Sequence, residues 1–331
     1  MELIITTYNT LLSCSDGCFK VSNDGKEQKV SVKDVSAIHL SRGVQVTTDA
    51  SMLAIENEIP VFFIEHSGKP VGRIWSPKYG SISTIRKGQL LFSQSPYAVQ
   101  WIKEELAQKI SNQQAMLLML PAQKSAKTNA KAVARLEDYR IKIQNCEGSK
   151  LRDLAGDLRG WEGNASRIYF QELNRFLPEK YRFEVRSQHP AQDIANAFLN
   201  YGYGILYSRI ESALIKAGID PYIGIMHRDE YNRPVLVYDV IERFRVWVDY
   251  VVFNLLNQLE VDQNYYSVDE KGAYWLENLG RRVLVQSINE YLEEVVHSNS
   301  MPASRQTQIM MFANSLAKTF SNFFSKNNEN S

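Results

Sequence analysis

The sequence contains few cysteines. Its 331 residues include only Cys14, Cys18 and Cys146, and three thiols cannot all pair within one chain. Cys14 and Cys18 are four residues apart in a predicted hairpin, and no second pair follows that would complete a zinc site. We therefore expect ordinary reduced thiols, as is typical of a cytoplasmic protein.

Long apolar runs are also missing. No stretch reaches the roughly 18 residues that indicate a membrane span. The first nine residues, MELIITTYN, include Glu2 and no basic segment, so the sequence predicts no secretory signal. With 44% apolar and 23% charged residues, the composition is that of a globular protein long enough for two domains.

An excess of charge of one sign is missing as well, because 38 basic residues balance 37 acidic ones and give a net charge of +1. Nucleic-acid binding would therefore require basic residues gathered on one face. A predicted helix over residues 122–146 is rich in them, either as an ordinary solvated face or as a phosphate-binding stripe. Its basic residues are Lys124, Lys127, Lys131, Arg135, Arg140 and Lys142.

Residues 1–90 are predicted to form a small β-rich domain. Short runs of strand-forming residues alternate with turn signals, notably two Asp-Gly pairs at 16–17 and 24–25. A short helix is expected near residues 48–57, and a hairpin is expected around residues 67–68. No catalytic constellation is visible in this part, where the isolated His39 and His66 are expected to be structural or solvated.

Beyond residue 90 a 3.6-residue apolar period dominates, which predicts an all-α domain over residues 91–324 and a polar, disordered tail over residues 325–331. The fold class is therefore α+β, with a small β-rich domain followed by a larger helical one. Glycines inside the helix predicted near 191–218 favour close helix packing over a phosphate loop, because no strand precedes them. The other predicted helices cover residues 97–120, 122–146, 151–158, about 164–176, 235–256, 272–297 and 301–324.

The stretch over residues 221–245, PYIGIMHRDEYNRPVLVYDVIERFR, holds His227, Asp239 and Glu242. Pro234 suits the first turn of a helix, and the apolar run after it predicts a buried helix that carries both acids on one face. Two carboxylates there need a positive partner. The partner is either a divalent metal with neutral His227 as a further ligand, or the helix dipole together with nearby arginines such as Arg245.

Four stretches together resemble one family, the CRISPR-associated integrases of spacer acquisition, which are the larger of the two adaptation proteins. The resemblance covers nearly the whole chain, and it depends on the ordered set of motifs because any single motif would be weak. It also implies a β-rich domain followed by a helical catalytic domain. The stretches are Gly160–Phe170 (GWEGNASRIYF), Asp193–Leu214 (DIANAFLNYGYGILYSRIESAL), Ala217–His227 (AGIDPYIGIMH) and Arg233–Arg245 (RPVLVYDVIERFR).

The resemblance implies a metal site. Carried over by motif, its ligands are Glu162 in the W-E-G context, His227 and Glu242, and the metal is Mg²⁺ or Mn²⁺. Asp239 matches an acid that supports the site, and Tyr207 matches a tyrosine near it. The family often has Asp where this sequence has Glu242, which is one methylene longer. The residues alone would favour a helix-dipole partner for Glu162. For Tyr207, a packed helix tyrosine with its hydroxyl hydrogen-bonded is an equally good alternative to a place near the active site.

The activity that the resemblance implies is attack of a DNA fragment's 3′-hydroxyl on a phosphodiester at the edge of a CRISPR repeat. A bound metal would neutralise the phosphate, so no side-chain nucleophile is needed. The implied partners are double-stranded DNA, a second copy of the chain that pairs through the β-rich domain over residues 1–90, and a small ferredoxin-like adaptation protein. The implied DNA surface includes Lys124, Lys127, Lys131, Arg135 and Arg167, together with Arg152 and Arg159. The alternatives are a catalytically silent DNA-binding scaffold and a general metal-dependent nuclease.

Overall fold

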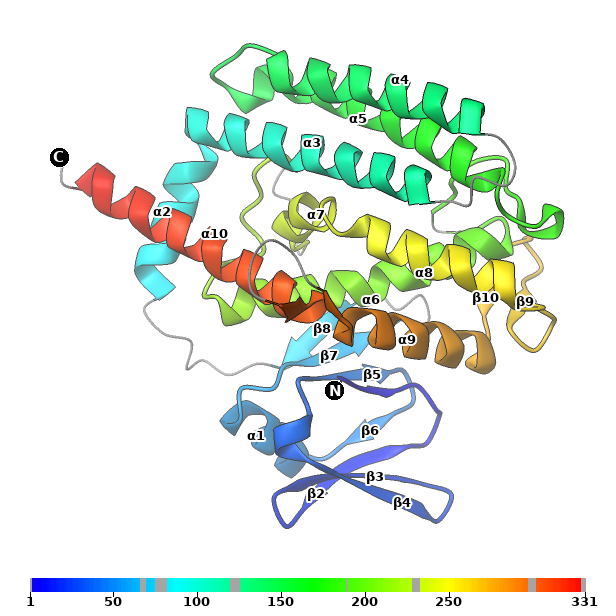
Figure 1. Cartoon of the computed structure of the whole chain (residues 1–331). Helices are drawn as coiled ribbons and strands as arrows, with labels where there is room; N and C mark the ends of the chain where they lie inside the picture. Colours follow the sequence, from blue (N-terminus) through cyan, green and yellow to red (C-terminus); the bar gives the residue numbers. More distant parts are fainter. Residues whose placement is uncertain are drawn as a thin grey trace.

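The computed structural model describes residues 2–65, 70–74, 82–119, 126–188, 190–227, 233–296 and 302–328. The N-terminal part holds two four-stranded sheets, one in the order β1-β5-β7-β8 and the other in the order β4-β3-β2-β6 (Figure 1). Its elements are β1 (Glu2–Ile5), β2 (Leu11–Ser15), β3 (Cys18–Asn23), β4 (Lys26–Ser31), β5 (Ala37–Ser41), β6 (Gln45–Val46), α1 (Thr48–Glu56), β7 (Val61–Ile64) and β8 (Pro70–Ile74).

The turns between the first strands are those that the two Asp-Gly pairs predict. Asp16, Gly17, Asp24 and Gly25 all have positive φ angles, as two-residue hairpin turns require. The antiparallel pairs β2–β3 and β3–β4 follow directly from these turns. The predicted turn at residues 67–68 and His66 lie outside the described residues.

In its described residues the remainder of the chain is mostly helical, which confirms the predicted fold class, although four short strands also occur there. Helix α5 runs without a break through Gly160, where the sequence predicted an interruption. The buried side of α5 continues across Gly160 and includes Leu154, Leu158, Ala165 and Ile168. The packing of this side therefore outweighs the cost of glycine in a helix, which is roughly 1 kcal/mol for each glycine relative to alanine. The helices are α2 (Ile82–Ser93), α3 (Pro96–Met119), α4 (Ala126–Asn145), α5 (Leu151–Asn174), α6 (Ile194–Lys216), α7 (Val235–Ile241), α8 (Arg245–Gln258), α9 (Asn278–Glu293) and α10 (Arg305–Asn328); the strands are β9 (Tyr266–Val268), β10 (Tyr274–Leu276), β11 (Val295–Val296) and β12 (Ala303–Ser304).

Helix α6 lies at the centre of the molecule, between the β-rich part and the layer of α3, α4 and α5 (Figure 1). Nearly all of its residues are buried, which explains why its sequence lacks a polar face. The Asp193 carboxylate accepts from the Asn196 backbone N–H and caps the first turn. Gly218, with φ of +83°, ends the helix as its position in the sequence predicted.

One buried and one partly buried ion pair join the β-rich part to α6. Glu2 of β1 contacts Arg209 at 3.2 Å, and Arg73 of β8 contacts Glu211 at 2.9 Å. His39 is not isolated, because its Nε2 lies 3.0 Å from the same Glu2 carboxylate.

Two helix boundaries differ from the predicted domain limits. Helix α2 begins before residue 91 and packs on α10, where a side chain at Gly88 would collide with the Phe320 carbonyl. Helix α10 continues to Asn328, so the first residues of the predicted tail are helical. The division into domains at residue 90 stays a prediction.

Candidate active site

His227 is held by Asp239 from the adjoining helix. The His227 Nδ1 lies 2.6 Å from Asp239 Oδ1, and the same carboxylate accepts from the backbone N–H groups of Ile225, Met226 and His227 at 2.8 to 3.1 Å. Asp239 is buried, whereas the His227 side chain is 42% exposed. With Nδ1–H donated to Asp239, the lone pair of Nε2 is free to bind a metal.

Glu242 follows directly after α7 and has different partners from Asp239. The single helix predicted over residues 235–256 is interrupted between α7 and α8, although Glu242, the residue that caps the end of α7, still has helical backbone angles. Glu242 Oε1 accepts from Arg245 Nε at 2.8 Å, and Glu242 Oε2 pairs with Lys109 of α3. The arginine partner predicted for these acids is therefore present at Glu242.

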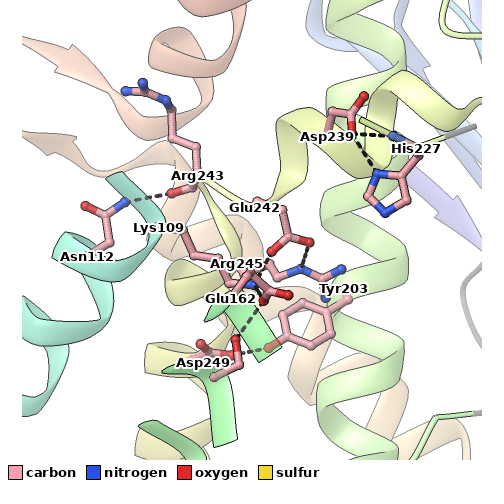
Figure 2. A network of polar contacts seen from close by, with 11 residues as sticks. Lys109, Asn112, Glu162, Tyr203, His227, Asp239, Glu242, Arg243, Arg245 and Asp249 are labelled. Atoms are coloured by element: carbon pink, nitrogen blue, oxygen red, sulfur yellow. Dashed lines mark hydrogen bonds and ion pairs between the residues drawn. The ribbon is translucent and has the colours of Figure 1, made fainter. Parts of the chain in front are cut away.

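Glu162 lies in the middle of α5 rather than near a helix start. Its Oε1 pairs with Lys109 Nζ and accepts from Ser166 Oγ at 2.8 Å. Glu162 and Glu242 thus contact the same nitrogen atom from two different elements. Figure 2 shows the Lys109 side chain reaching both carboxylates, with His227 and Asp239 to one side of this group.

The three predicted metal ligands are only partly brought together. The structure joins Glu162 to Glu242 through Lys109 and joins His227 to Asp239. In the part of the chain that the structure describes, no three His, Cys, Asp or Glu side chains are grouped closely enough to hold a metal ion. The ligand set therefore stays a prediction.

The charges of Glu162 and Glu242 are compensated by those of Lys109 and Arg245. Burial alone lowers the pKa of Lys109, but Glu242 and Glu162 outweigh burial and raise it above the ordinary value, so the ammonium stays charged. Burial raises the pKa of Glu242, but Arg245 and Lys109 together hold it at about 2. The Glu242 carboxylate, the Lys109 ammonium and the Arg245 guanidinium therefore coexist in ionised form.

Glu162, Lys109 and Glu242 line a cleft of about 860 Å³, to which His227 and Tyr207 do not contribute. The Arg186 and Arg245 guanidinium carbons lie 5.3 and 4.8 Å from the centre of the Tyr203 ring. The basic side chains that line the cleft form what we call the arginine wall: Lys109, Arg167, Arg175, Arg186 and Arg245. Phosphate oxygens are natural ligands of such ammonium and guanidinium groups.

Behind this wall the Asp249 carboxylate is buried and accepts from the hydroxyl groups of Tyr169, at 3.0 Å, and Tyr203. Burial raises the pKa of Asp249 to about 6, although both tyrosines lower it. Asp249 therefore anchors the ring over which Arg186 and Arg245 lie.

Tyr207 of α6 packs beside the segment that carries His227. Its hydroxyl donates to the Pro234 carbonyl at 3.1 Å, and its ring lies 5.1 Å from the Tyr238 ring. The Tyr238 ring in turn lies 5.6 Å from the His227 ring. These contacts support the interpretation of Tyr207 as a packed helix tyrosine with a hydrogen-bonded hydroxyl. The Tyr238 ring lies between Tyr207 and His227.

The basic residues predicted to bind DNA lie on two helices. Lys131 and Arg135 are exposed and one turn apart on α4, and Arg167 is exposed on α5 at the cleft. Lys124 lies outside the described residues, and for Lys127 only the helical backbone is described. The assignment of these residues to DNA binding stays a prediction.

Sequence reasoning missed Lys109 and Arg186. Lys109 lies on the buried stripe of α3 with Leu106, Ile110 and Gln113, so a charge on an apolar face was the available signal. Arg186 precedes α6 in an irregular segment and donates to Asn196 and Asn200 on that helix. No periodic signal could have identified it.

The donor types fit Mg²⁺ or Mn²⁺. Two carboxylates that already share one cationic partner supply hard oxygen ligands, and a neutral imidazole bonded through Nδ1 supplies one nitrogen. Among the described residues, no helix is apolar and long enough to cross a membrane.

Comparison with known proteins gives one consistent family. The family model described as "CRISPR associated protein Cas1" matches residues 3–290. The chain is 29% identical over 307 residues to "CRISPR-associated endonuclease Cas1 1" of Archaeoglobus fulgidus, covering 88% of each chain.

Two solved structures share the fold. A structure described as "Casposase bound to integration product" has a TM-score of 0.82 at 20% identity, with coverage of 97% of this chain and 91% of that one. A chain of a "Cas6-RT-Cas1--Cas2 complex" has a TM-score of 0.81 at 24% identity, and 97% of this chain spans 35% of that longer chain. Since the family model matches nearly the whole sequence, this chain belongs to the Cas1 family of CRISPR-associated proteins.

Proposed function

We propose that this chain is a metal-dependent DNA endonuclease and integrase that joins the 3′-hydroxyl ends of short foreign DNA fragments to the repeat end of a CRISPR array. The convergence of Glu162 and Glu242 on one point, in a cleft walled by arginines, carries the proposal. The "endonuclease" in the name of the A. fulgidus relative and the integration product bound to the casposase support it.

In this proposal Glu162, Glu242 and His227 would hold one Mg²⁺ or Mn²⁺ ion, which would neutralise the phosphate under attack and polarise the leaving oxygen. Asp239 fixes the tautomer of His227, since it accepts from Nδ1 and leaves Nε2 for the metal. Tyr207 packs behind this segment and keeps it in place.

The arginine wall positions the DNA. Arg245 and Arg186 are preorganised over Tyr203, and guanidinium groups held in this way can bind phosphate oxygens with little loss of side-chain entropy. Lys131, Arg135 and Arg167 would extend phosphate contacts away from the reacting bond, without sequence preference.

The proposed partners are double-stranded DNA, from incoming fragments and the CRISPR repeat, a second copy of this chain and a small ferredoxin-like adaptation protein. The presence of Cas2 in the complex that contains a similar fold supports the last of these. In an assembly in which two dimers of this chain flank the small adaptation protein, two active sites could then act on the two ends of one DNA fragment.

Strand transfer on supercoiled repeat DNA with added Mn²⁺ tests the proposal. The wild-type chain should give joined products, and His227→Ala should give none while its thermal unfolding and oligomeric state stay unchanged. Products at the wild-type rate from His227→Ala would remove His227 from the site. No Mn²⁺-dependent product from the wild-type chain would favour a silent scaffold, and plain degradation without joining would favour a general nuclease.

A further inference from the structure

Lys109 lies where two predicted metal ligands meet. Its side chain is only 8% exposed, and its Nζ contacts both Glu162 Oε1 and Glu242 Oε2. It projects from α3, whereas the carboxylates come from α5 and from the residue after α7 (Figure 2). A buried lysine is normally costly, so its presence between two acids indicates a specific role for the charge.

The ammonium neutralises a repulsion that would otherwise separate the two acids. Glu242 has a second cation, because Arg245 binds its other oxygen at 2.8 Å. Glu162 has Ser166 and Lys109 as its partners, and Lys109 is the charged one of these two. Without Lys109, one guanidinium would face the two carboxylates, so this pair of acids would lack one compensating positive charge at partial burial.

A divalent cation would need the same oxygen atoms. Glu162 Oε1 and Glu242 Oε2, which Lys109 binds, face one common point, whereas Glu242 Oε1 is already held by Arg245. A metal at the common point and an ammonium beside it would repel each other strongly at this degree of burial. The two cations therefore exclude one another.

We propose that Lys109 is a built-in counter-ion that holds Glu162 and Glu242 together in the metal-free protein and leaves this position when a divalent cation binds. The inference rests on the proposed function, since it requires these carboxylates to bind metal. Lysine suits the role, because its charge is a compact group on a flexible four-carbon stem that can swing away. Lys109 is then a positioning residue that sets the metal affinity of the site.

Titration of the full-length protein with Mn²⁺ alone, followed by the loss of the free-ion electron paramagnetic resonance signal, tests the inference without any measurement of catalysis. Lys109→Gln should bind Mn²⁺ at least about tenfold more tightly than the wild-type chain, because the competing cation is gone. Its melting temperature should fall in EDTA and recover with Mn²⁺, because the metal then neutralises the carboxylates.

Two further variants control the experiment. Lys103→Gln changes a partly buried lysine on the same helix that donates to the Cys146 carbonyl, so its Mn²⁺ affinity should equal that of the wild-type chain. Lys109→Arg should bind Mn²⁺ more weakly than the wild-type chain, because a guanidinium holds carboxylates through two parallel hydrogen bonds. If Lys109→Gln does not fold, this second comparison decides the matter.

Equal or weaker Mn²⁺ binding by Lys109→Gln, or equal or tighter binding by Lys109→Arg, would overturn the role of Lys109. Glu242→Gln separates this failure from failure of the proposed function. If the wild-type chain binds Mn²⁺ no better than Glu242→Gln, the metal site itself is wrong and the inference falls with it. If Glu242→Gln weakens binding and the Lys109 variants do not differ from wild type, only the inference falls.

Discussion

Glu162 and Glu242 contact a single nitrogen atom, Lys109 Nζ, although they belong to separate segments of the chain. This relationship makes the site a product of tertiary packing among α3, α5 and the α7–α8 junction. It also accounts for how two carboxylates can share a partly buried cleft, with Arg245 as the second compensating charge.

Replacement of Asp239 by Asn should destabilise the protein and weaken metal binding together. The carboxylate accepts three backbone N–H groups and the His227 ring, and an amide would turn its own N–H toward some of these donors. We expect a loss of about 2 kcal/mol in the free energy of unfolding and roughly a tenfold or greater loss of Mn²⁺ affinity. Urea unfolding and Mn²⁺ titration measure the two effects.

Asp269→Asn is the matched control for this change. The Asp269 carboxylate also accepts backbone N–H groups, from Lys271 and Ala273 at 2.9 Å, but in an exposed loop. Its replacement should leave Mn²⁺ binding unchanged. Unchanged Mn²⁺ affinity in Asp239→Asn would show that Asp239 does not orient a metal ligand.

Asp249 should make stability fall as the pH rises from about 4 to about 6. Burial raises the pKa of its carboxyl from 3.8 to about 6, so the folded state binds a proton that the unfolded chain has lost in this range. The contribution is fully present below the unfolded pKa and is lost as the pH rises through the folded one. At 1.36 kcal/mol per pH unit, the change is about 3 kcal/mol.

Asp249→Asn removes the titrating group and should flatten this dependence. Urea unfolding of both proteins at several values between pH 4 and 7 gives the difference in their free energies of unfolding. The advantage of the wild-type chain should shrink by about 3 kcal/mol across the range. A difference that stays constant with pH would mean that Asp249 keeps its ordinary pKa.

Glu2→Gln should weaken the attachment of the β-rich part to α6. Glu2 is buried between His39 and Arg209, and its removal leaves Arg209 without its carboxylate partner. We expect a loss of about 3 to 5 kcal/mol. Glu27→Gln, which breaks an exposed pair with Lys20, should cost about 1 kcal/mol or less in the same urea measurement.

The Glu2 contribution also has a pH dependence of opposite sign. Burial raises the pKa of Glu2, but Arg209 and His39 lower it to about 2. Its stabilisation is therefore present above the ordinary value of 4.5 and is lost as the pH falls toward 2. An equal effect of Glu2→Gln at pH 3 and pH 7 would contradict this assignment.

Replacement of Arg167 by Ala should weaken DNA binding without a change in stability, because the side chain is exposed at the cleft. Each lost phosphate contact should reduce the slope of log affinity against log salt by about 0.9. The double variant Lys131→Ala and Arg135→Ala should reduce it by about twice as much if α4 also binds DNA. Fluorescence anisotropy between 50 and 200 mM salt measures both, and unchanged slopes would remove these residues from the interface.

Local signals in the sequence predicted much of the fold. The Asp-Gly turns and the end of α6 at Gly218 depend on neighbours within a few residues, so the sequence alone identifies them. The limits of α5 and α7 could not be predicted in this way. Packing carries α5 across Gly160, and the pairing of Glu242 with Lys109 and Arg245 accompanies the interruption after α7.

In the candidate site, too, residues in local motifs could be predicted, whereas a residue whose role depends on tertiary packing could not. Glu162, His227, Asp239 and Glu242 were predicted because they sit in recognisable motifs. Lys109 was not, since its role depends on which helices meet α3, and no pattern within α3 reveals that.

X-ray diffraction from crystals soaked in Mn²⁺, with data collected at the manganese absorption edge, tests the central claim most directly. We predict one anomalous peak within about 2.2 Å of oxygen atoms of Glu162 and Glu242 and of Nε2 of His227, with the Lys109 ammonium displaced from between the carboxylates. A peak elsewhere, or no peak while Lys109 stays paired with both acids, would contradict the account.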